Sequence, residues 1–132
     1  MNQWRIQEAI FARLSGYAPL AGRVGGRIYD AVPQDTEFPY VAIGEDDSTA
    51  YDDDVNLGAD TDLTLHVWSR YEGRKEAKEI LQLIYDALNR YPLVVAGAHT
   101  VLLDAEYQNT LLDPDGLTRH GVIRFRLLTT YS

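Results

Sequence analysis

The most restrictive pattern in this sequence lies near its C-terminal end, where apolar and charged side chains alternate along one segment. Within residues 122–130, Ile123, Phe125 and Leu127 alternate with two arginines at positions 124 and 126. Successive side chains of a strand point to opposite faces of a sheet, so this alternation predicts a strand with one buried face. We therefore expect a sheet that other elements of the chain cover on one side.

The first covering element is a helix predicted at residues 3–15. Its apolar residues recur at the four-residue step of a helix and are Ile6, Ile10 and Leu14. Gly16 is expected as the C-cap glycine, and Pro19 as the stop that follows it. We interpret the apolar stripe as packing on the domain's own sheet, with a surface for a partner protein as the alternative.

A second helix is predicted at residues 77–88 and has the clearest helical pattern in the chain. Its apolar residues at i, i+3, i+4 and i+7 spacing are Ala77, Ile80, Leu81, Ile84 and Leu88. Gly73 is the expected N-cap, with a capping box from Ser69 and Glu72 as the alternative. Asn89 closes the helix.

The remaining elements are short strands between turn signals. In residues 60–69, Leu63, Leu65 and Val67 point to one face of the predicted strand, while Thr64, His66 and Trp68 point to the other. Because both rows contain bulky side chains, we expect both faces of this strand to be covered. Shorter strands are expected at residues 27–31, 40–44, 93–96 and 100–106. Residues 113–116 (DPDG) are a strong turn signal. Gly22, Gly25 and Gly26 also mark a turn, because their spacing fits neither the dinucleotide fingerprint nor the P-loop.

These elements predict one α+β domain over residues 1–132, with a mixed, mainly antiparallel sheet and two helices packed on one face. The helix at residues 77–88 allows one crossover connection. A chain of 132 residues fits the usual size of a single domain.

Acidic residues are concentrated in one segment, an acidic loop expected at about residues 45–62. Its carboxylates are Glu45, Asp46, Asp47, Asp52, Asp53, Asp54, Asp60 and Asp62. The whole chain has 12 basic and 20 acidic residues, so without these eight the charges balance at 12 each. The absence of a basic face argues against a general nucleic-acid-binding protein.

Three interpretations of the acidic loop stay open at this point. It is a solvated, mobile connection, a weak Mg²⁺ or Ca²⁺ site, or a surface used in assembly or in repelling nucleic acid. Asp52, Asp54 and Asn56 match the first three ligand positions of an EF-hand calcium loop. The match then fails, because Leu57 and Leu63 occupy the positions of the glycine and the bidentate glutamate. For the third interpretation, the candidate assembly or lumen-facing residues are Asp46, Asp47, Asp52, Asp53 and Asp54.

The candidate partners of the acidic loop lie at the start of the second helix. Arg74, Lys75 and Lys78 place positive charge where the helix dipole disfavours it. Nearby glutamates offset part of this cost. We expect the acidic loop of the same or a neighbouring chain to offset more, and list these three residues as candidate intersubunit contacts.

The sequence has no recognisable catalytic, cofactor or metal motif. Cysteine is absent, and the histidines at 66, 99 and 120 are far apart in the sequence and lack metal-ligand spacing. No nucleophile elbow occurs. The N-terminus is polar, and no apolar run approaches the roughly 20 residues that span a bilayer. We therefore expect a protein made in the cytoplasm, with no cofactor, no metal and no membrane partner.

Several segments in order resemble the tail-completion family of long-tailed bacteriophages. They are residues 25–30 (GGRIYD), 32–33 (VP), 38–45 (FPYVAIGE), 65–69 (LHVWS), Gly73, the helix at 77–88, 115–116 with 120–121 (DG and HG), and 125–126 (FR). The resemblance spans most of the chain from Leu20 to Thr130, but not the acidic segment at residues 46–62.

The resemblance implies a non-enzymatic tail terminator, which caps the tail tube as a hexameric ring and joins it to the head connector. Related proteins occur in prophages and gene transfer agents. The implied partners are further copies of this chain, the tail-tube protein and the connector protein, with DNA passing through without specific binding. The implied location is the virion tail. The alternatives are a head–tail adaptor or stopper, an acidic DNA mimic, and a small metal-assisted hydrolase that uses the acidic cluster.

Overall fold

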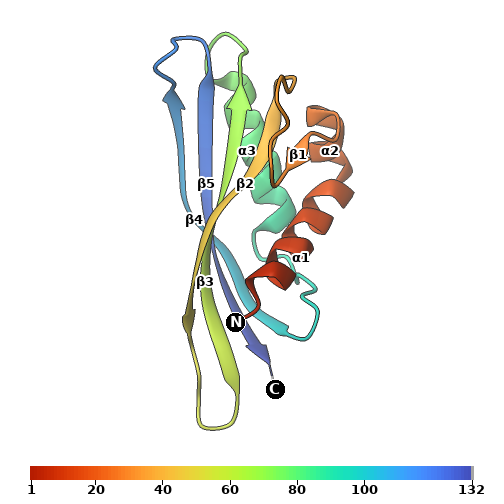
Figure 1. The fold of residues 1–132 in the computed structure, drawn as a ribbon, viewed down its shortest axis with the longest axis vertical. Coiled ribbons are helices and arrows are strands. Elements are labelled where there is room, and N and C mark those ends of the chain that lie inside the picture. The colour runs from red at the N-terminus through yellow and green to blue at the C-terminus, as the bar shows by residue number, and fades with distance from the viewer. Residues whose placement is uncertain (132) are drawn as a thin grey trace.

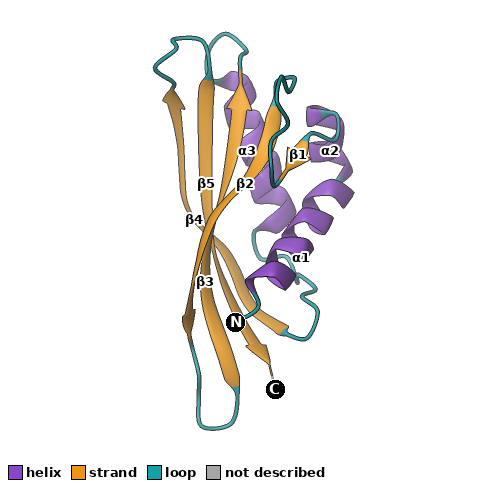
Figure 2. Cartoon of the chain, in the orientation of Figure 1, coloured by secondary structure: helices purple, strands orange, loops and turns teal. Residues whose placement is uncertain are grey.

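The computed structural model describes residues 1–131, which form one layer of helices on one face of a twisted sheet (Figures 1 and 2). Within this range there are three helices and five strands. They are α1 (Gln3–Gly16), α2 (Ala18–Val24), β1 (Ile28–Tyr29), β2 (Tyr40–Ala50), β3 (Leu57–Ser69), α3 (Lys75–Leu88), β4 (His99–Leu112) and β5 (Arg119–Tyr131). None of the helices in residues 1–131 is long and apolar enough to cross a membrane.

The sheet has the order β1-β2-β3-β5-β4. β1 pairs with β2 in parallel, and the other three pairings are antiparallel. α3 connects β3 to β4, and β5 then returns between them, which is the single crossover that the sequence predicts. The α+β class and the mixed sheet are therefore confirmed, whereas the prediction of two helices is wrong because α2 makes a third.

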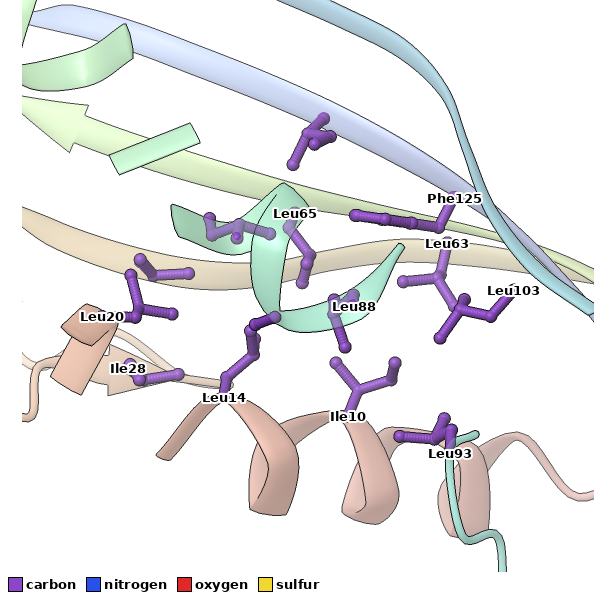
Figure 3. Packing of buried hydrophobic residues seen from close by; sticks show 14 of the residues in the cluster. Ile10, Leu14, Leu20, Ile28, Leu63, Leu65, Leu88, Leu93, Leu103 and Phe125 are labelled. Carbon is purple, nitrogen blue, oxygen red and sulfur yellow. The ribbon is translucent and has the colours of Figure 1, made fainter. Parts of the chain in front are cut away.

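The hydrophobic core lies between the sheet and the helix layer (Figure 3). The predicted apolar positions of both long helices are buried, and so are Ile123, Phe125 and Leu127 of β5. Thus the stripe of α1 packs within the domain, as expected. Two large side chains of α1, Trp4 and Phe11, nevertheless remain 60% and 43% exposed.

The chain between α1 and β1 differs from the prediction. Gly16 is the last residue of α1 and the C-cap is Tyr17, after which α2 begins at once. Pro19 lies in the first turn of this helix instead of stopping the first helix, because proline is tolerated at that position. Gly25 ends α2 in the left-handed conformation, with φ of 60°. β1 is shorter than the predicted strand at residues 27–31.

The predicted acidic loop is wrong as a loop, because most of it is a β-hairpin. β2 continues to Ala50 and β3 already begins at Leu57, so only residues 51–56 connect them. Asp and Gly lower strand propensity in this segment, yet the antiparallel register between the two strands holds, with one bulge after Ile43. Figure 1 shows this hairpin extending beyond the rest of the molecule. We call residues 45–62 the acidic arm.

The segment after α3 also departs from the prediction. Residues 93–96 do not form a strand, but Leu93 and Val95 are both buried while Val94 is 84% exposed. The alternation in this segment therefore anchors an irregular connection to the core. β4 is twice the predicted length, and the expected turn at residues 113–116 closes the β4–β5 hairpin.

The start of α3 has a different cap from either predicted one. Arg74 occupies the N-cap position and no side chain caps the helix there. The Ser69 hydroxyl instead donates to the carboxylate of Glu76 at 2.8 Å and accepts from the Tyr71 amide at 3.2 Å. Asn89 is the C-cap, as predicted.

Candidate assembly surface

The acidic arm has an ordered tip that displays apolar and acidic side chains together. The Asp53 carboxylate accepts hydrogen bonds from the amides of Val55 and Asn56, at 2.8 and 2.6 Å. These bonds hold the pKa of Asp53 below its usual value. In and beside this turn, Tyr51, Val55 and Leu57 are 58%, 88% and 54% exposed. Such apolar exposure on a projecting hairpin indicates a contact surface.

Carboxylates also line the arm on the outer face, which we define as the sheet face opposite the helices. Asp47 and Asp62 are directly opposite each other in register. Like charges in this arrangement destabilise a sheet, so the isolated fold gains nothing from them. Asp60 is paired, because Arg126 donates to both its oxygens at 2.8 to 3.3 Å. That guanidinium lowers the pKa of Asp60.

The candidate basic partners lie far from the arm tip in the same molecule. Arg74, Lys75 and Lys78 are exposed, and none of the ion pairs among residues 1–131 involves them. β3 alone, with 13 residues, separates the two regions by about 40 Å. The tip of an arm therefore does not reach these residues in its own chain, and the expectation of a same-chain contact is wrong. A contact with a neighbouring chain is the other expectation, and it stays a prediction.

A histidine cluster on the outer face was not visible in the sequence. The pairing of β3 with β5 places His66 Nδ1 2.7 Å from His120 Nε2. Trp68 stacks on the His120 ring at 3.9 Å, and a Glu45 carboxylate oxygen lies 3.4 Å from His66 Nε2. The signal was the alternation of residues 64, 66 and 68, but only the strand order shows which strand lies beside it.

The histidine cluster gives a prediction for the dependence of stability on pH. Burial, and then the neighbouring His66, lower the pKa of His120, while Asp113 and Glu45 act in the opposite direction. Below about pH 6.5 the unfolded chain therefore binds more protons at this site than the folded chain. We expect the free energy of unfolding, measured by urea titration, to decrease as pH falls from 7 through this range.

A variant that keeps the stack on Trp68 but does not titrate isolates this effect. His120→Phe should show a weaker loss of stability on acidification than the wild type. His99→Gln, which removes an exposed histidine at the far end of β4, serves as the matched control for the loss of a histidine outside the cluster. Equal slopes for His120→Phe and the wild type would contradict the assignment.

Side chains of the types that bind metal ions are dispersed over residues 1–131. In the described part of the chain, no three His, Asp or Glu side chains are arranged to hold a metal ion. His66 uses both ring nitrogens for contacts with His120 and Glu45. The features that stand out are therefore surfaces: the acidic arm, the exposed basic start of α3 and the exposed aromatic residues of α1.

Comparisons with known proteins show which proteins this chain resembles. A family model described as tail completion protein gp17 matches residues 8–130. The tail completion protein gp17 of Bacillus phage SPP1 is 31% identical over 121 residues, which cover 92% of this chain and 89% of that protein.

Two solved structures resemble the fold. A chain in the virion of a native gene transfer agent particle has a TM-score of 0.88 and 28% identity, covering 94% of this chain and 93% of that chain. The structure of the bacteriophage SPP1 gp17 protein has a TM-score of 0.57 and 31% identity, covering 92% of this chain and 86% of that chain. The conformation described here thus matches a chain within an assembled particle.

Proposed function

This chain belongs to the tail completion protein gp17 family of phages and gene transfer agents, and on that premise we propose that it caps the finished tail tube as a ring and joins it to the head connector. As a member of this family it is a structural component of the virion tail. The ring contains six copies, and the protein acts by docking without catalysing a reaction.

The main support for this proposal is the similarity of the fold to a virion component. The fold agrees closely with a chain that is part of an assembled virion, over nearly its whole length. A ring needs a heterologous interface, in which two different surfaces of each copy meet and the rotation closes on itself. The acidic arm and the basic start of α3 are two such surfaces, and they lie too far apart to satisfy each other within one chain.

The arm serves assembly in this proposal, and its carboxylates Asp46, Asp47, Asp52, Asp53 and Asp54 face neighbouring subunits. A surface that only repelled DNA in the lumen would need charge alone. The arm also exposes Tyr51, Val55 and Leu57. Apolar groups among carboxylates fit a protein contact better than a wall beside DNA. With a net charge of −8, the chain lets DNA pass without binding it.

The proposal is tested by mixing the purified chain with its cognate tail-tube subunit and imaging the tubes by electron microscopy. We expect a ring of this protein at one end of each tube. Binding to the connector protein with no density at tube ends would favour the adaptor or stopper alternative. Binding to neither would overturn the proposed function.

A further inference from the structure

The sheet has two edge segments that nothing in residues 1–131 pairs with. β1 covers only Val41 and Ala42 of β2, so the arm part of β2 has an open edge. On the other side, the chain after α3 covers part of β4, because the Arg90 amide donates to the Leu103 carbonyl at 2.7 Å. Asn89 likewise accepts from the Ala105 amide at 2.9 Å. Beyond this point the edge of β4 is open.

The hydrogen-bond pattern identifies which residues of β4 face outward. The Asp113 amide donates to the Thr118 carbonyl, so the ladder between β4 and β5 uses every second residue from there. The Thr110 amide donates to the side-chain oxygen of Asn109 at 2.8 Å and not to β5. By alternation, the outward-facing backbone groups belong to Gln108, Thr110 and Leu112.

The same reasoning applies to β2. The Tyr51 amide donates to the Gly58 carbonyl at 2.9 Å, which fixes the alternation between β2 and β3. The outward-facing backbone groups of the arm then belong to Asp46, Ser48 and Ala50. Each open edge therefore presents three residues at alternate positions, over about 14 Å in each case.

The surroundings of the two edges have opposite charge. A groove of about 430 Å³ runs between α3 and the open part of β4 and is lined by Lys78, Gln82, Gln108, Asn109 and Thr110. Lys75 precedes Lys78 by one turn on the same helix. Across the arm, Asp46 and Asp47 flank the open edge of β2. Charge complementarity of this kind aligns two surfaces and disfavours wrong partners.

We propose that the open edge of β2 in one copy of this chain pairs with the open edge of β4 in the next copy, which joins their sheets. This inference rests on the proposed ring and names its interface. β2 and β4 run in opposite directions within the sheet. A rotation about the ring axis keeps the direction of each strand along that axis, so the two edges meet antiparallel.

In this arrangement, Asp46, Ser48 and Ala50 lie opposite Leu112, Thr110 and Gln108. Pairing with a neighbouring copy explains why the end of β4, with its exposed Leu111 and Leu112, is not covered by another segment of residues 1–131. The carboxylates at the β2 edge would also repel other copies of the same edge. This restricts pairing to the basic side of a neighbour.

Cysteine pairs test the interface directly, because the chain has no cysteine of its own. Ala50→Cys is combined in turn with Gln108→Cys, Thr110→Cys or Leu112→Cys, and particles assembled with each variant are oxidised. We expect a ladder of disulfide-linked oligomers on non-reducing gels, strongest for Ala50 with Gln108, since antiparallel neighbours lie within disulfide reach. The control pairs Ala50→Cys with Gln34→Cys, which is exposed in the loop after β1.

The outcomes separate the interface from the ring. Rings without a ladder in any of the three variants, or a ladder equal to that of the control, would overturn the edge pairing and leave the proposed function intact. Absence of rings in the wild type would overturn both. If the cysteine variants fail to assemble, a charge swap tests the same interface. Lys78→Glu should reduce ring formation about tenfold, and adding Asp46→Lys should restore most of it. No restoration would contradict the interface.

Discussion

Replacing Phe125 by alanine is expected to remove about 3–5 kcal/mol from the free energy of unfolding. Phe125 is fully buried at the centre of β5 and faces the helix layer (Figure 3). Truncation leaves a cavity between the sheet and the helices that close-packed neighbours cannot fill. Domains of this size are stable by only about 5–15 kcal/mol, so a large share of the stability is lost.

Urea titration followed by circular dichroism measures this change. The matched control is Val94→Ala, because Val94 lies in the same chain but is 84% exposed and should change stability by less than about 0.5 kcal/mol. If Phe125→Ala cost no more than Val94→Ala, the core described here would be wrong.

Replacing Lys75 and Lys78 together by glutamine is expected to weaken assembly about tenfold and to make it less dependent on salt. The same change should leave the isolated chain as stable as before or slightly more stable. Both cations lie near the N-terminus of α3, where each costs about 0.3–1 kcal/mol when exposed. Opposite effects on folding and on assembly would show that these residues serve an intermolecular contact.

The control for this variant is Arg5→Gln with Arg23→Gln, which changes the net charge by the same amount. Arg5 and Arg23 form exposed ion pairs with Glu8 and Glu79, and such pairs contribute little to stability. Ring formation is measured by light scattering and electron microscopy over a range of salt concentrations. An unchanged salt dependence in the Lys75 and Lys78 variant would contradict the role proposed for them.

Much of the fold could be predicted because hydrophobic periodicity is strong where elements pack on the core. Ile80 and Ile84 on α3, and Ile123 and Phe125 on β5, are apolar at the spacing that their elements require. α2 was missed because three glycines and Pro19 suggest a turn. Leu20 and Val24 of α2 are buried against other helices. The pattern of residues within this short segment does not reveal those contacts.

The acidic arm was read as a loop because aspartates have low strand propensity. Pairing with β5 supports β3 over its whole length, from Leu57 opposite Tyr131 onward, and this long-range register overrides the local preference. The candidate residues of the arm and of α3 lie at the surface, half-buried at Asp46 and exposed at the others, and their role in assembly stays a prediction. Their separation, and the open edges beside them, follow only from the strand order.

The claim on which this account depends is that the chain acts by binding to the end of a tail tube and stopping its growth. The most direct measurement is the length distribution of tubes that the cognate tail-tube subunit forms, with and without this chain, by electron microscopy. We predict that tubes stay short and uniform when the chain is present and grow beyond that length when it is absent. Identical length distributions in the two samples would contradict the account.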